Sequence, residues 1–315
     1  MNSMRYDSIK VLVAEPSADL RRQIKSTLHN FGIKNVIDTG NLGVVVDTIN
    51  EGSIDLLIGD TKMPEGDLSE VVYNIRHGDV GDNPFLVTII LVSDPSKEIL
   101  KKVIDSGTDV ILVKPFALGD ISDRIDALAK YRKRFVVTAK YVGPDRRGKT
   151  RVEGEEIQLI TVPNPLQDKS LGHSDRLKIK RDVESATKLI NEQKIERYAV
   201  QINWLIDRIT PDFVPLDPAE TINLDPDVVK YLKGLSVVAE DFRRRLKKTR
   251  FLHLSEMGVT LRNMSNSMLA SAGKVTVEDL VIMSKLGMTI QNTFDRWKLL
   301  EDADKAKASD EAGYS

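Results

Sequence analysis

The sequence predicts an α/β fold followed by an all-α region: first a doubly wound, five-stranded parallel sheet, then a set of helices. Two observations lead to this prediction. Up to about residue 131, short runs rich in Val, Ile and Leu alternate with amphipathic stretches, as in sheet strands buried on both faces and the helices between them. From residue 175 onward, apolar residues recur at three- and four-residue steps, which is the spacing of helices that bury one face.

Five short apolar segments are expected to be strands. They are Ile9–Ala14, Asn35–Ile37, Asp55–Gly59, Phe85–Val92 and Val110–Val113. The helices expected around them are Ser17–Phe31, Asn41–Glu51, Leu68–His77, Ser96–Ser106 and Leu118–Tyr131. A glycine follows four of these helices, as is common where a helix ends. Strands that alternate with helices favour right-handed crossovers and a site at the carboxyl ends of the strands.

Residues 132–174 have the character of an ordered or extended connector. Phe135–Val142 has strand propensity, and Pro163-Asn164-Pro165 rules out a continuous helix. The helices expected next are Asp175–Glu192, Ile195–Ile209, Asp225–Glu256, Leu261–Ala272 and Thr276–Leu300. Whether the third of these helices is broken near Gly234 stays open. Residues 302–315 are small and polar and are predicted to be disordered. The predicted domains are therefore residues 8–131, the connector 132–174, the helical domain 175–301 and the tail 302–315.

Composition and charge exclude several classes of function. The 315 residues include 46 basic and 47 acidic side chains, for a formal net charge of −1, so no general attraction to nucleic acid or to an anionic membrane is expected. The chain has no cysteine, which excludes disulfides, thiolate metal ligands and cysteine nucleophiles. It shows neither a secretory signal nor an apolar run of about 20 residues, so we expect a cytoplasmic protein without a membrane span.

Polar residues directly follow four of the predicted strands. Glu15 follows the first strand, Asp60 the third, Ser93 the fourth and Lys114 the fifth. Because the carboxyl ends of parallel strands meet at one edge of the sheet, these side chains are expected to lie together. The sequence therefore predicts a site made of two carboxylates, a hydroxyl and an ammonium.

These segments resemble the response regulator receiver family over about residues 8–131. Asp60-Thr61-Lys62-Met63-Pro64 matches the Asp-x-x-Met-Pro segment around the family's phosphoacceptor, and Lys114-Pro115-Phe116 matches its Lys-Pro-Phe. Ser93 stands where the family has Ser or Thr, and Glu15 stands where it has the first of two acids. The resemblance is specific because four elements occur in order, each after its own strand.

The resemblance implies a phosphorelay signalling protein rather than an enzyme. Asp60 would accept a phosphoryl group from a histidine kinase or a phosphotransfer protein, and the only chemistry would be this self-catalysed transfer and the later hydrolysis of the aspartyl phosphate. Mg²⁺, which prefers oxygen ligands, would be held by Glu15, Asp60 and the backbone carbonyl of Lys62. Lys114 would pair with the phosphoryl oxygens, and Ser93 would donate a hydrogen bond to one of them.

Three positions depart from the family pattern. Pro16 stands where a second acid is usual, so we expect weak Mg²⁺ binding. Ile111 stands where a switching aromatic residue is usual, and Asp94 adds a negative charge beside Ser93. An atypical receiver that is not phosphorylated and acts as a scaffold therefore stays open as an alternative.

Two further motifs are rejected. Gly143 to Thr150 satisfies the phosphate-loop pattern literally, but that loop needs a helix starting at its Lys-Thr pair. Here Gly154 and a strand-like Ile157–Val162 follow instead, so a basic turn is expected. His253 and Glu256 stand three residues apart, but no second such pair exists to complete a metal site.

The helical region carries no comparable motif. Its long amphipathic helices and the near-neutral charge favour a protein-binding output domain, with an unidentified protein partner, under the control of the receiver. The basic run Arg243-Arg244-Arg245-Leu246-Lys247-Lys248-Thr249-Arg250 could contact phosphates, so a DNA-binding transcription regulator remains the second alternative.

Overall fold

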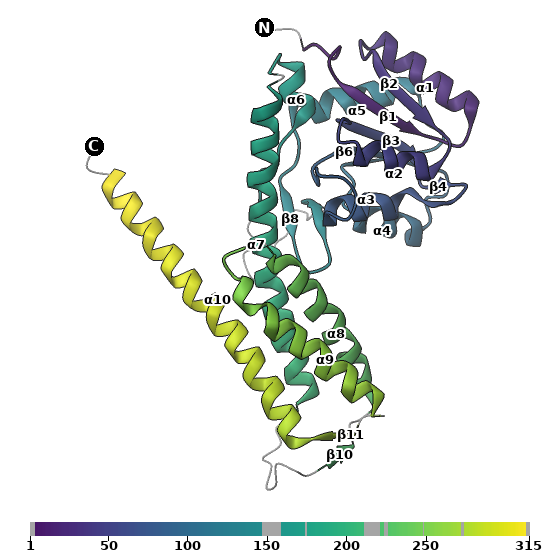
Figure 1. Cartoon of the computed structure of the whole chain (residues 1–315). Helices are drawn as coiled ribbons and strands as arrows, with labels where there is room; N and C mark the ends of the chain where they lie inside the picture. Colours follow the sequence, from purple (N-terminus) through teal and green to yellow (C-terminus); the bar gives the residue numbers. More distant parts are fainter. Residues whose placement is uncertain are drawn as a thin grey trace. The chain divides into compact units, whose positions relative to one another are not determined.

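The computed structural model describes residues 4–146, 159–173, 175–210, 221–223, 226–247, 249–271 and 274–312. The chain divides into two compact units, residues 1–190 and 191–315 (Figure 1). The boundary between these units lies within one helix, α7, which runs from Arg176 to Ile209.

A five-stranded parallel sheet forms the centre of the first unit. Its strands are β1 (Lys10–Ala14), β2 (Asn35–Thr39), β3 (Leu56–Asp60), β6 (Val87–Val92) and β7 (Val110–Val113), in the order β2-β1-β3-β6-β7. Strands β3 and β6 are buried along their whole length, as their runs of branched apolar residues require. The doubly wound parallel sheet predicted from the sequence is confirmed.

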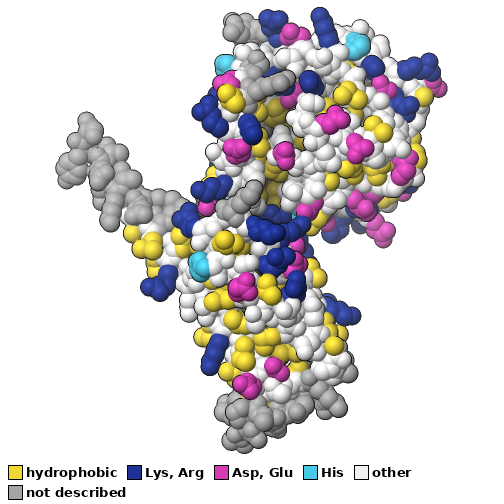
Figure 2. Space-filling model, viewed as in Figure 1, with side chains coloured by type: hydrophobic (Ala, Val, Ile, Leu, Met, Phe, Trp, Pro, Cys, Tyr) yellow, Lys and Arg dark blue, Asp and Glu magenta, His cyan; other side chains and the backbone are white. Residues whose placement is uncertain are grey.

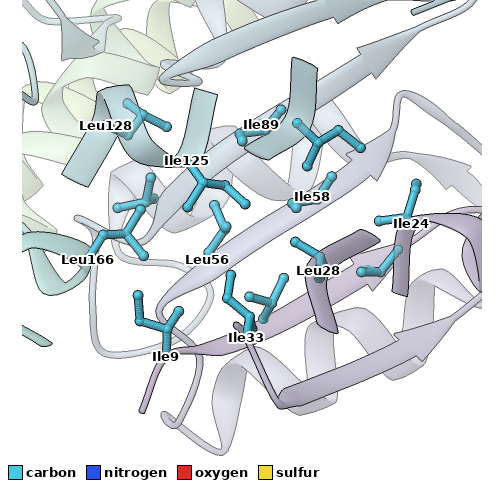
Figure 3. Packing of buried hydrophobic residues seen from close by; sticks show 14 of the residues in the cluster. Ile9, Ile24, Leu28, Ile33, Leu56, Ile58, Ile89, Ile125, Leu128 and Leu166 are labelled. Carbon is cyan, nitrogen blue, oxygen red and sulfur yellow. The ribbon is translucent and has the colours of Figure 1, made fainter. Parts of the chain in front are cut away.

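Five helices cover the two faces of the sheet. They are α1 (Ala18–Asn30), α2 (Leu42–Asn50), α3 (Leu68–His77), α4 (Lys97–Asp105) and α5 (Leu118–Lys130). Figure 3 shows Ile24 of α1 and Ile125 of α5 packed with Ile58 of β3 on one face. On the other face, Val72 of α3 and Val103 of α4 pack with the sheet. The helix positions therefore follow the amphipathic pattern of the sequence.

Residues beyond α5 are folded into the first unit. Strands β8 (Phe135–Val137) and β9 (Val142–Pro144) form an antiparallel hairpin, and α6 (Pro165–Ser170) begins at the Asn164 cap. Phe135 is fully buried and packs with Phe85 and with Val183 of α7. A Cβ on Gly107, whose φ is +80°, would lie 2.1 Å from the carbonyl oxygen of Val142. The hairpin therefore lies so close to the turn before β7 that only glycine fits at position 107.

A buried ionic network holds this hairpin in place. Asp109 accepts a hydrogen bond from Arg76 at 2.9 Å and another from Arg132 at 2.9 Å, and each of the three side chains is at most 2 % exposed. Burial would raise the pKa of the Asp109 carboxyl, but the two guanidinium groups outweigh it and lower that pKa. The Phe135 ring lies 5.3 Å from the Arg76 guanidinium carbon and 5.1 Å from that of Arg132.

In the part of the second unit that the structure describes, the elements are helices and one short antiparallel ladder. Its elements are the rest of α7, α8 (Pro226–Leu246), η1 (Leu252–Leu254), α9 (Ser255–Ala270), α10 (Val277–Ala312), and the antiparallel strands β10 (Thr221–Asn223) and β11 (Lys274–Thr276). Its core is apolar, and Phe251 contacts both Phe294 and Trp297 with ring centroids 4.6 and 5.3 Å apart.

Several predicted boundaries in this region are wrong. Helix α7 is continuous through residues 193–194, because Ile190 and Ile195 stay buried on either side of a polar stretch that has good helix propensity. Helix α8 passes through Gly234 and ends at Leu246, well before Glu256. Helix α10 extends to Ala312, where disorder was expected from residue 302, because Ala and Lys in this stretch also favour a helix. Residues 313–315 lie outside the described residues.

We predict that Arg132→Met lowers the free energy of unfolding by about 3–5 kcal/mol, because it removes one partner of a buried charge network. Urea denaturation of the full chain measures this loss. The exposed neighbour variant Lys133→Met should change the same free energy by no more than about 0.5 kcal/mol. Equal losses in the two variants would show that the network does not hold the hairpin.

Candidate functional site

The structure brings together the four side chains that follow the strands. The Lys114 Nζ atom lies 2.5 Å from Asp60 Oδ2 and 2.7 Å from Glu15 Oε2, so one ammonium bridges both carboxylates. The Ser93 hydroxyl donates to Asp60 Oδ2 at 3.2 Å. The four residues lie up to 99 positions apart in the chain and meet at the carboxyl edge of the sheet.

Local packing brings the two acids side by side. Ala14 and Gly59 are register partners on the neighbouring strands β1 and β3, and Glu15 and Asp60 are the next residues along these strands. A Cβ on Gly59 would lie 2.6 Å from the Ala14 carbonyl oxygen, so a larger residue would push the strand ends apart. The absence of a side chain at Gly59 therefore allows the two carboxylates to share Lys114.

The two carboxylates are buried. The Glu15 and Asp60 side chains are 4 % and 5 % exposed, whereas Lys114 is 21 % exposed. Partial burial acts to lower the pKa of Lys114, but its hydrogen bonds to Asp60 and Glu15 outweigh this and raise that pKa. One ammonium against two carboxylates leaves the cluster with one net negative charge, which favours the approach of a cation.

Backbone groups orient the remaining carboxylate oxygens. Asp60 Oδ1 accepts the Lys62 amide at 2.7 Å, and Glu15 Oε1 accepts the Ser17 amide at 3.0 Å. Asp94 accepts the Ser96 amide at 3.1 Å, so its carboxylate is engaged at the start of α4. The segment after Asp60 forms a small hairpin, β4 (Lys62–Met63) paired with β5 (Gly66–Asp67).

Two charged residues beside this site were missed by sequence reasoning. Arg21 of α1 donates to the carbonyl of Glu15 at 2.5 Å and to that of Pro16 at 2.9 Å. Glu65, in the turn between β4 and β5, accepts from Asn41 and Leu42 at the start of α2. Each looks like an ordinary solvated charge in the sequence, and no motif signals either contact.

Other features of the molecule lie away from this cluster. A cleft of about 780 Å³ is lined by residues of α3 and α4 and by Lys140 and Tyr141 of the connector hairpin, and it does not include Asp60. His253 and Glu256 are both exposed. Among the described residues, no group of three or more His, Cys, Asp or Glu side chains is arranged to hold a metal. Of the described helices, none combines the length and apolarity needed to cross a bilayer.

Comparison with known proteins finds similarity over the first part of the chain. The family model of the response regulator receiver domain matches residues 11–126. Chemotaxis protein CheY-3 of Vibrio cholerae is 20 % identical over 128 residues, which cover 41 % of this chain and 97 % of the relative. Transcriptional regulatory protein PdtaR of Mycobacterium tuberculosis is 24 % identical over 143 residues, covering 45 % of this chain and 67 % of the relative.

Among solved structures, the receiver domain of the Francisella response regulator 1452 is 25 % identical. The alignment covers 38 % of this chain and 94 % of that chain, with a TM-score of 0.35. The family match identifies residues 11–126 of this chain as a response regulator receiver domain. Proteins with this domain are in general signalling proteins and not enzymes, and residues 127–315 lie outside the matched segment.

Receiver domains in general use Mg²⁺ for phosphorylation, and the residues present here fit that ion. Glu15 and Asp60 offer adjacent carboxylate oxygens, which are the ligand type that Mg²⁺ prefers. The Lys62 backbone belongs to the hairpin directly after Asp60. Pro16 contributes neither a carboxylate nor an amide proton, so the donor set has one acid fewer than is usual for the family.

We predict that Lys114→Met lowers the free energy of unfolding in metal-free buffer by about 3 kcal/mol, because two buried carboxylates lose their shared cation. Adding Asp60→Asn to this variant should restore more than half of the loss, since one carboxylate then remains. Lys62→Met, an exposed lysine two residues from Asp60, is the control. Denaturant titration of each variant measures these free energies of unfolding. If the losses caused by Lys114→Met and Asp60→Asn simply add in the double variant, the shared ion pair is contradicted.

Proposed function

We propose that this protein is a phosphorelay response regulator of the cytoplasm in which Asp60 accepts a phosphoryl group. The observation that supports this most strongly is the placement of one carboxylate oxygen, Asp60 Oδ2, between the ammonium of Lys114 and the hydroxyl of Ser93. A cation and a hydroxyl donor beside a buried carboxylate are the groups that stabilise a phosphoryl group bound to it.

In the proposed reaction, an Asp60 carboxylate oxygen attacks phosphorus of a phosphohistidine on a histidine kinase or phosphotransfer protein. The oxygen–phosphorus bond forms as the phosphorus–nitrogen bond breaks, and the released imidazole takes a proton. The Lys114 ammonium and the Ser93 hydroxyl then turn from the carboxylate to the phosphoryl oxygens. Hydrolysis of the acyl phosphate regenerates the carboxylate and releases inorganic phosphate.

Mg²⁺, when bound, would neutralise the approaching phosphoryl anion beside the two carboxylates. Its proposed ligands are Glu15, Asp60 and the Lys62 carbonyl. We propose that it binds weakly, because Pro16 removes one carboxylate and the Glu15 oxygens already accept from Ser17 and Lys114. The positive charge of Lys114 also repels Mg²⁺ at short range.

We propose that the helical unit is an output region that binds a protein partner. Two arginines of its basic run pair with acids of the same helix: Arg243 with Glu240, and Arg244 with Asp241. Figure 2 shows acidic and hydrophobic side chains on the visible face as well as a group of basic ones. Such a mixed surface favours protein recognition over the DNA-binding alternative, which needs a continuous basic stripe.

Incubation of the full chain with acetyl phosphate and Mg²⁺ should add one phosphoryl group to the intact mass. Asp60→Asn should abolish the addition, because the amide is not a competent nucleophile. Asp123→Asn, which neutralises an exposed aspartate of α5, should leave it unchanged. An unmodified wild-type protein under these conditions, or equal labelling of Asp60→Asn, would favour the alternative of a receiver that acts as a scaffold.

Mixed-sequence duplex DNA should bind the full chain with a dissociation constant weaker than about 100 µM at moderate salt, because Arg243 and Arg244 of α8 already have carboxylate partners. Fluorescence anisotropy across a salt series measures this. The DNA-binding alternative makes the opposite prediction, namely tight binding that is lost in salt and weakened by replacing Arg243, Arg244 and Arg245 with alanine.

A further inference from the structure

Residues 38–42, which comprise the end of β2, the turn after it and the first residue of α2, contact the loop that carries Glu15. The Glu15 amide donates to the Thr39 carbonyl at 3.1 Å. Arg21, which donates to the carbonyls of Glu15 and Pro16, also lies 3.4 Å from Asp38 Oδ2. A Cβ on Gly40 would lie 2.8 Å from the Arg21 Nη1 atom, so this glycine makes room for the guanidinium. The first acidic loop is thereby held against residues 38–40.

The loop that follows Asp60 is held by the other end of the same connection. The Glu65 carboxylate accepts from the Asn41 side-chain amide at 2.9 Å and from the Leu42 backbone amide at 3.1 Å. Leu42 is the first residue of α2, where backbone amides lack partners within the helix and a negative charge is favoured. Glu65 therefore fixes the turn of the β4–β5 hairpin to the start of α2.

This attachment matters because of what the hairpin carries. Lys62, the residue whose carbonyl is the proposed third Mg²⁺ ligand, lies in β4, and its amide donates to Asp60 Oδ1 at 2.7 Å. With Pro16 in place of an acid, the ligand set depends on this backbone carbonyl more than it would if a second acid were present. A displaced hairpin would move both Lys62 and the Asp60 carboxylate that its amide orients.

We propose that Glu65 is a positioning residue for Mg²⁺: by holding the β4–β5 hairpin on the start of α2, it places the Lys62 carbonyl and Asp60 and offsets the acid missing at Pro16. This proposal rests on the assignment of the Glu15–Asp60 cluster as the magnesium site. Glu65 itself is not a ligand in this account, since both of its carboxylate oxygens accept hydrogen bonds from α2 and its Asn41 cap.

The test is Mg²⁺ binding to the full chain, measured by isothermal titration calorimetry without any phosphodonor. Glu65→Ala should raise the dissociation constant about tenfold, as loss of a group that orients metal ligands typically does. Glu65→Gln, which keeps one acceptor oxygen, should raise it less. Glu51→Ala removes an exposed carboxylate at the opposite end of α2 and should leave the constant within about twofold.

Thermal unfolding of the same variants without Mg²⁺ separates positioning from general stability. A lower unfolding temperature in Glu65→Ala with an unchanged Mg²⁺ constant would overturn the proposal, and so would wild-type protein that binds no Mg²⁺. If Glu65→Ala does not fold, Glu65→Gln decides by the same criterion. If Mg²⁺ binds and Glu65→Ala weakens it while acetyl phosphate leaves Asp60 unmodified, the positioning role stands and the phosphoacceptor function fails.

Discussion

Two buried carboxylates that share a single ammonium set the main constraint on this molecule. Glu15 and Asp60 are almost fully removed from solvent, and like charges in that setting are costly unless a cation lies between them. Lys114, the residue directly after β7, supplies this cation. The register of β1 against β3, the absence of a side chain at Gly59 and the placement of β7 all serve to bring these three groups together.

A second buried ionic cluster extends the receiver beyond its usual end. Asp109 holds Arg76 of α3 and Arg132 of the connector, and the Phe135 ring lies close to both guanidinium groups. The β8–β9 hairpin and the first turns of α7 consequently share a core with the receiver. Helix α7 continues without a break across the boundary between the two units.

Most of the sheet and its helices could be predicted from the sequence because their cores are apolar and periodic, so hydropathy alone locates them. The placement of Asp60 and Lys114 followed from strand ends and two short motifs. The Asp109 network and the contacts of Arg21 and Glu65 could not be foreseen, because a charged residue looks the same in sequence whether it is solvated or paired. The continuity of α7 and the length of α10 could not be predicted from hydropathy, because polar residues with good helix propensity continue both helices.

The most direct test of the central claim is a structure of the full chain with beryllium trifluoride and Mg²⁺, a stable mimic of the phosphorylated carboxylate. We expect the fluoroberyllate on an Asp60 oxygen, with Lys114 and Ser93 contacting its fluorine atoms and no longer the carboxylate. A structure in which Asp60 stays unmodified and Lys114 still bridges it to Glu15, at saturating beryllium fluoride, would contradict the assignment of Asp60 as a phosphoacceptor.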